Sequence, residues 1–172
     1  MRLLRSANPS AVQRRGGLAA AAGVLSLASL AAQAAPPPCP YQADLVSKVV
    51  GLRVAAGQAE PGIGGTSCKY AGQNGGPSLW VLVLPPGSDQ AMMRTMTAGG
   101  PKARFEPIAG DPDGAARVRS PAGDGVVDLS YTRGGYVVFV RASGMGHEPD
   151  AKTRAARDDA LAAKLLKLPR IP

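Results

Sequence analysis

One histidine and two cysteines are the most reactive side chains in this sequence of 172 residues. Such a chain cannot build a zinc site from four cysteines, from two cysteines with two histidines, or from three histidines. His147 could be the base of a Ser-His-Asp site, as in a small hydrolase, with Ser143 or Ser130 and Asp150 as its partners. No G-x-S-x-G elbow is present, and His147 lies in the Gly-rich segment GMGHEP. We therefore expect a solvent-exposed histidine and no catalytic residue.

Methionines offer a second kind of chemistry. Met92, Met93 and Met96 are clustered, and Met145 lies two residues before His147. Thioethers and imidazole suit Cu(I), so a soft-metal (copper) binding protein is an alternative interpretation. Methionine at helical spacing more often fills a hydrophobic core. We expect core packing, with no bound metal and no cofactor.

Two aspartates in the segment GDPDG resemble part of a calcium loop. Asp111 and Asp113 have suitable spacing, but the rest of the EF-hand pattern, including its bidentate glutamate, is missing. We expect a turn in which aspartate side chains bond to nearby backbone. The segment GIGG (62–65) is too short for a phosphate-binding loop.

The net charge of +8 falls to +4 once the first 34 residues are set aside, because four arginines and no acid lie there. Mixed signs along the rest of the chain argue against nucleic-acid binding. The pairs Arg117/Arg119 and Arg154/Arg157 could meet an anionic envelope polymer, but we expect them to be solvated surfaces.

Residues 1–34 have the pattern of a secretory signal peptide. A basic head is followed by the apolar run GGLAAAAGVLSLASLAAQAA, which closes on small residues. We expect cleavage after Ala34 or after Ala35, and a periplasmic or secreted protein with no membrane span after cleavage. Arg14 and Arg15 stand just before the apolar run, so both the Sec and the twin-arginine routes stay open.

Cys39 and Cys68 are the only thiols, and an oxidising compartment would favour their pairing. Three prolines precede Cys39, where a lipobox needs leucine and small residues, so we expect no lipid anchor. A disulfide would close a loop of 30 residues, counting both ends. Chain entropy assigns such a loop about 3.5 kcal/mol of stabilisation.

Hydrophobic periodicity and turn residues divide the rest of the chain into elements. A Pro-rich extended lead (35–40) precedes one domain (41–169), and 170–172 form a tail. Within the domain we expect helices at 41–50, 89–98 and 150–168, strands at 67–72, 77–85 and 115–120, a loop at 52–66 and a short extended piece near 103.

The clearest signal is a hairpin of strands 126–132 and 136–142 around Gly134-Gly135. A two-residue loop there places Leu129 opposite Val140, Tyr131 opposite Val138, and Asp128 opposite Arg141. The first two pairs would lie on an apolar face, and the last would form an exposed ion pair on the other face.

Tight turns between successive strands indicate an antiparallel sheet. The predicted fold is α+β, with about five to six strands and three helices packed mainly on one face.

The order of several short motifs adds to this prediction. They are Cys39 before a helix that ends in VVG (49–51), SCKY (67–70), GDPDGA (110–115), and LAAKLLKLP (161–169) in the terminal helix. This pattern resembles the small secreted or lipid-anchored α+β domains of unknown function of high-GC bacteria, over most of the chain. Many of those domains are anchored through a lipidated cysteine, unlike our expectation for Cys39. The resemblance implies a fold and a compartment, and no catalytic residues. Together these observations predict an exported, non-enzymatic domain whose partner is an unknown envelope protein or polymer.

Overall fold

The computed structural model describes residues 38–62, 64–87, 103–119 and 125–171, all of which belong to one compact unit that spans 35–172. Its helices are α1 (Ala43–Val50) and α3 (Ala151–Leu165), with a short 3-10 turn, η1 (Gln73–Gly75). Its strands are β1 (Gln58–Gly62), β2 (Gly65–Tyr70), β3 (Ser78–Leu84), β4 (Arg104–Pro107), β5 (Ala116–Arg119), β6 (Val126–Arg133) and β7 (Tyr136–Ser143).

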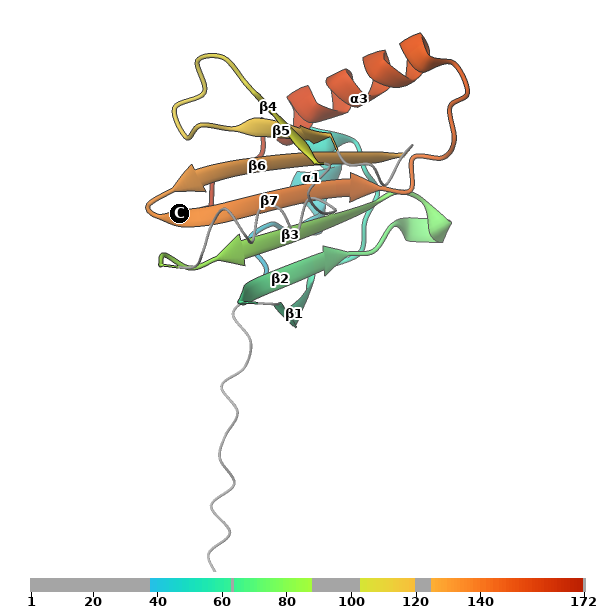
Figure 1. Ribbon diagram of the computed structural model, residues 1–172. Coiled ribbons are helices and arrows are strands. Elements are labelled where there is room, and N and C mark those ends of the chain that lie inside the picture. Colours follow the sequence, from blue (N-terminus) through green and yellow to red (C-terminus); the bar gives the residue numbers. More distant parts are fainter. Residues whose placement is uncertain (1–37, 63, 88–102, 120–124, 172) are drawn as a thin grey trace, which may run out of the picture. The chain divides into compact units, whose positions relative to one another are not determined.

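The seven strands form one antiparallel sheet in the order β1-β2-β3-β7-β6-β5-β4 (Figure 1). The α+β class is confirmed, but the expected five to six strands were too few. The edge strand β1 was missed, because an edge strand pairs on one side only and its sequence need not alternate. The strand β4 corresponds to the short extended piece expected near 103. The described residues contain two helices, and the third expected helix, 89–98, lies outside them.

Two meanders make up this sheet. One runs β1-β2-β3 and the other runs β4-β5-β6-β7, and they join where β3 pairs with β7. The 19 residues between Leu84 and Arg104 connect the two meanders.

The β6–β7 hairpin has the predicted register. Leu129 lies opposite Val140 and Asp128 lies opposite Arg141. The turn uses Gly134 and Gly135 at φ of 58° and 82°, values that a primed hairpin turn requires and that glycine adopts without strain.

The sheet buries apolar side chains on both faces. On the first, which we call the helical face, residues such as Leu129 and Val140 pack in one core with Val46 of α1 and Leu165 of α3. On the opposite face, which we call the second face, a smaller cluster contains Leu82, Leu84, Val137 and Phe139. The strand expected at 77–85 is therefore confirmed as β3, and it pairs with β2 and β7 and carries apolar side chains on both faces.

The helices begin and end at residues suited to those positions. α1 ends at Gly51, which takes a left-handed φ of 84°. Asp150 caps α3 by accepting a hydrogen bond from the amide of Thr153 at 2.7 Å. Hydrogen bonding with the side chain of Thr153, and then with its amide, lowers the pKa of the Asp150 carboxyl.

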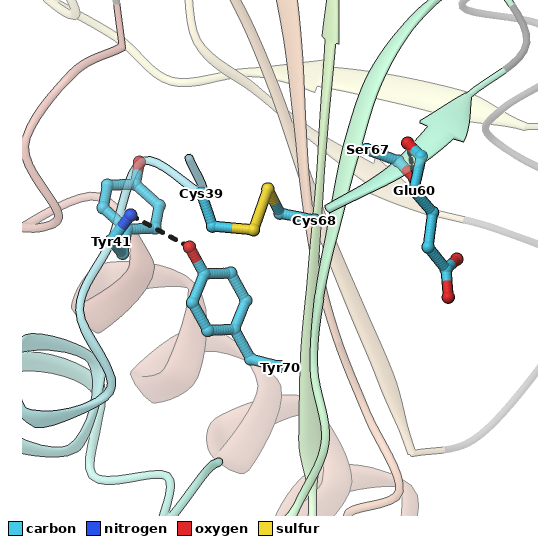
Figure 2. The surroundings of a disulfide bond; sticks show 6 residues. All are labelled: Cys39, Tyr41, Glu60, Ser67, Cys68 and Tyr70. Atoms are coloured by element: carbon cyan, nitrogen blue, oxygen red, sulfur yellow. Dashed lines mark hydrogen bonds between the residues drawn. A yellow bond between two sulfur atoms is a disulfide. The ribbon is translucent and has the colours of Figure 1, made fainter. Parts of the chain in front are cut away.

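The disulfide joins the N-terminal lead to the sheet (Figure 2). Cys39 and Cys68 are bonded, with their Cα atoms 5.6 Å apart, so the predicted pairing is confirmed. Two residues after Cys39, the amide of Tyr41 donates a hydrogen bond to the hydroxyl of Tyr70 at 2.9 Å. The lead is thus fixed to β2 by one covalent bond and one buried hydrogen bond.

The C-terminal residues are packed on the domain, so our prediction of a tail at 170–172 is wrong for Arg170 and Ile171. Ile171 is buried, and Arg170 forms an ion pair with Asp111. The guanidinium of Arg170 also lies 4.5 Å from the ring centroid of Tyr131. We had placed the end of the domain at Pro169 because proline ends a helix. The end of a helix, however, does not determine whether the residues after it pack on the domain.

Candidate functional site

The residues considered for a hydrolase have other roles in the structure. The hydroxyls of Ser143 and Ser78 are hydrogen-bonded to each other at 3.0 Å. The hydroxyl of Ser130 is fully buried without a partner, and Asp150 caps α3. His147 is exposed, as predicted. These positions give no support for a Ser-His-Asp site.

The soft-metal alternative also gains no support. Met92, Met93 and Met96 lie outside the described residues, so neither core packing nor metal binding is tested for them. Met145 is half-buried against the main core. Among the described residues, no group of three or more His, Cys, Asp or Glu side chains could hold a metal ion.

The GDPDG segment is a turn held by its own aspartate, as expected. The Oδ1 atom of Asp111 accepts hydrogen bonds from the amides of Asp113 at 3.0 Å and Ala115 at 3.1 Å. Its Oδ2 atom pairs with Arg170, while Asp113 lies 3.6 Å from the same arginine. The two carboxylates therefore fix the C-terminal residues.

The paired arginines are not simply solvated surfaces. Arg117 is buried beneath α3, where it contacts Asp158, so the expectation for it is wrong. Arg157 is half-buried and also pairs with Asp158, while Arg154 donates to a backbone carbonyl. The side chain of Arg119 is not among those that the structure describes. The periodicity of single strands could not show that a helix with a matching carboxylate covers Arg117.

One concave site on the second face combines an aromatic ring with polar groups of both kinds. We call it the Trp80 hollow, and its volume is about 360 Å³. It is lined by Glu60, Lys69, Ser78, Leu79, Trp80, Arg141 and Ser143. These residues come from β1, β2, β3 and β7, four neighbours in the sheet.

Strand register explains why three of these side chains meet. Lys69 lies opposite Trp80 in the β2–β3 pair, and Trp80 lies opposite Arg141 in the β3–β7 pair. Directly opposite residues of an antiparallel pair share a face, so Lys69, Trp80 and Arg141 form a row across three strands. Asp128 continues that row on β6.

Asp128 holds Arg141 in a fixed position beside Trp80. Arg141 donates from Nε to one carboxylate oxygen at 2.7 Å and from a terminal nitrogen to the other at 2.8 Å. These hydrogen bonds raise the pKa of Arg141. The guanidinium carbon lies 5.8 Å from the Trp80 ring centroid, within cation–π range.

The Asp128–Arg141 pair is not exposed, which corrects our prediction. The carboxylate side chain is only 5% exposed, and that of the arginine is 31% exposed. The register placed the pair on the correct face but could not show how deeply the pair is buried there.

The rim of the hollow offers donors and acceptors of hydrogen bonds. Lys69 and Glu60 are exposed and contribute one charge of each sign. The bonded hydroxyls of Ser78 and Ser143 are half-buried at another part of the lining. Because Asp128 already compensates Arg141, the formal charges of the described residues that line the hollow sum to zero.

A second hollow, of about 190 Å³, lies beside the disulfide. Its lining consists of Pro38, Pro40, Thr66, Cys68, Val81, Val83 and Ile171. The lining carries no charge, so it offers little to select a polar ligand.

Sequence reasoning missed the Trp80 hollow, although part of the signal was present. The alternation in 67–72 and 77–85 could have placed Lys69 beside Trp80. Arg141 could be added only by knowing that β3 pairs with β7, and Ser78 and Ser143 there are 65 residues apart. Glu60 comes from a strand that we had assigned to a loop.

No protein-family model and no curated protein matches this chain. Among solved structures, it is similar to a GTP binding regulator from Thermotoga maritima. That similarity has a TM-score of 0.34 and 11% sequence identity, over 73% of this chain and 88% of the other. Values this low support no argument about fold or function.

Proposed function

We propose that this protein is an exported, non-enzymatic binding domain whose ligand or partner occupies the Trp80 hollow. The hollow supports this function because it combines an aromatic ring with several polar groups that converge on one concavity. Two hydrogen bonds to Asp128 already hold the Arg141 side chain, so this side chain would need little ordering on binding.

Two observations argue for binding rather than catalysis. The described lining of the hollow contains no histidine and no cysteine, and its two serines are hydrogen-bonded to each other. Both cysteines of the chain are joined in the disulfide. A nucleophile at this site would thus lack the adjacent imidazole that usually activates it.

Export is the second part of the proposal. A disulfide is compatible with an oxidising compartment outside the cytoplasm. No helix in the described part of the chain is long and apolar enough to cross a membrane. We attribute export to residues 1–34 as a cleaved signal peptide and place the mature protein in the periplasm or outside the cell. We likewise propose membership of the small secreted α+β domains that the motif order resembles.

The mass of the exported protein tests this assignment. We expect the intact mass of material recovered outside the cytoplasm to correspond to a chain that begins at Ala35 or Pro36. The full-length mass, or a mass increased by diacylglycerol, would contradict it.

Co-sedimentation with a cell-envelope preparation tests the binding function. The exported protein, with its disulfide intact, should sediment with the envelope material, and Trp80→Ala should remain in the supernatant. Tyr136→Ala is the matched control, because Tyr136 is an exposed aromatic residue outside the hollow. Sedimentation of neither protein, or of the Trp80 variant as well as the unmodified protein, would contradict the proposal.

A further inference from the structure

We infer that the ligand of the Trp80 hollow is an uncharged saccharide, bound with one pyranose ring against Trp80. This inference rests on the proposed binding function and gives it a chemical class. A pyranose has an apolar face of C–H groups and an edge of hydroxyls that both donate and accept hydrogen bonds. Its two kinds of surface correspond to the two kinds of group in the hollow.

The aromatic part of the match is Trp80. Its side chain is half-buried and packs against the smaller cluster of the second face, so its ring is not free to rotate. Arg141, from the neighbouring strand, lies over one face of the ring and limits its movement, so the pyranose would stack on the other face. A large, fixed apolar surface at low conformational cost is what a ligand with one apolar face requires.

The polar part of the match is the mixture of donors and acceptors. Lys69 is a donor only, the Glu60 carboxylate is an acceptor only, and the hydroxyls of Ser78 and Ser143 can do both. Sugar hydroxyls can satisfy all three kinds of group at once. A ligand that carries only acceptors, such as a phosphate, would leave Glu60 facing like charge.

The balance of charge argues for an uncharged saccharide in particular. Two nitrogen atoms of Arg141 donate hydrogen bonds to the Asp128 carboxylate. The charge of this arginine is therefore already compensated. Lys69 and Glu60 then balance each other, so the described part of the rim has no excess of either sign. Strongly acidic saccharides would gain no net attraction from such a site.

Fluorescence of Trp80 is a direct readout, because it is the only tryptophan of the chain. The probes are the neutral tetrasaccharides cellotetraose and maltotetraose, with polygalacturonate as the acidic comparison. At least one neutral probe should change the emission saturably and bind more tightly than the acidic one. No saturable change with either neutral probe, or tighter binding of polygalacturonate, would overturn the inference.

Two lysine variants locate the binding. Lys69→Met should weaken the affinity for the neutral probe about tenfold, as expected for loss of one hydrogen bond from a charged donor. Lys152→Met, on the exposed surface of α3, is the matched control and should bind as the unmodified protein does. Equal affinity of the two variants would place the saccharide elsewhere and would contradict the inference.

Treatment of the envelope preparation separates this inference from the proposed function. Periodate cleaves vicinal diols of sugars, and later borohydride reduces the aldehydes so that they cannot react with lysines. Loss of co-sedimentation after periodate, with retention after proteinase, supports the saccharide. Loss after proteinase alone would overturn the saccharide and keep the binding function. Failure to bind the untreated preparation would instead contradict the proposed function itself.

Discussion

The hydroxyl of Tyr131 accepts a hydrogen bond from the backbone amide of Ile171 at 2.9 Å, which ties the end of the described chain to β6. Tyr41 makes a similar link, since its hydroxyl donates to the carbonyl of Pro169 at 3.0 Å. Tyr70 in turn accepts from the amide of Tyr41. Three buried tyrosines therefore hold the N-terminal lead and the C-terminal residues on the helical face.

We predict that ionisation of these tyrosines lowers the stability of the protein at alkaline pH. Burial raises the pKa of Tyr41, Tyr70 and Tyr131 above the ordinary value of about 10. Unfolded tyrosines ionise first as the pH rises, so the stabilisation is complete below about pH 10 and falls above it. Urea unfolding between pH 8 and about pH 11 should show this decline. Tyr41→Phe should make the decline shallower, whereas Tyr136→Phe should leave it unchanged; equal slopes in all three proteins would contradict this explanation.

Removal of Asp128 should be strongly destabilising. Asp128→Ala removes the carboxylate that pairs with the largely buried Arg141 guanidinium. We expect the free energy of unfolding to fall by about 2–4 kcal/mol. Glu60→Ala, which removes an exposed carboxylate of the same face, should change stability by less than about 0.5 kcal/mol. Denaturant titration measures both. A small effect of Asp128→Ala would mean that the pair is solvated, as we first expected from the sequence.

Ser130 gives the opposite prediction. Its hydroxyl is fully buried on the second face and has no hydrogen-bond partner. Ser130→Ala removes an unsatisfied polar atom, so stability should be unchanged or should rise by about 1 kcal/mol. Ser67→Ala is the control, because the Ser67 hydroxyl donates to the carbonyl of Glu60 at 3.2 Å. This variant should lose about 1 kcal/mol of stability. A clear loss of stability in Ser130→Ala would show that the hydroxyl has a partner after all.

The disulfide should contribute a large share of the stability. Reduction, or Cys68→Ser, should lower the free energy of unfolding by about 3.5 kcal/mol, as chain entropy predicts for this loop. Thermal unfolding with and without reductant measures the difference. Free-thiol labelling of the native protein should give a value near zero, and two reactive thiols would refute the bridge.

The strongly patterned parts of the fold could be predicted from sequence. Alternation around Gly134-Gly135 gave the correct register, because a slip of one residue would expose Leu129. The terminal helix expected at 150–168 is present as α3, where Leu161 and Leu165, at helical spacing, are both buried. The disulfide followed from the presence of only two cysteines.

The remaining features depend on contacts between distant segments. β1 contains the sequence QAEPG, which has no apolar alternation and pairs only with β2. Burial of Arg117 depends on α3, and the fixed position of Arg170 depends on the GDPDG turn. The Trp80 hollow, likewise, requires the pairing of β3 with β7. The hydrophobic pattern of one segment does not show which distant segment it will contact.

The division of the sheet into two meanders bears on the order of folding. Pairs within each meander are close in sequence, whereas the β3–β7 pair joins residues as far apart as Ser78 and Ser143. Closing so long a loop is entropically costly before its contacts form, so we expect the meanders to form first and their junction last. Trp80 and Arg141 lie on opposite sides of that junction. In stopped-flow refolding, emission of Trp80 should therefore reach its native value in the slowest phase, and the hollow can exist only in molecules that have completed that phase.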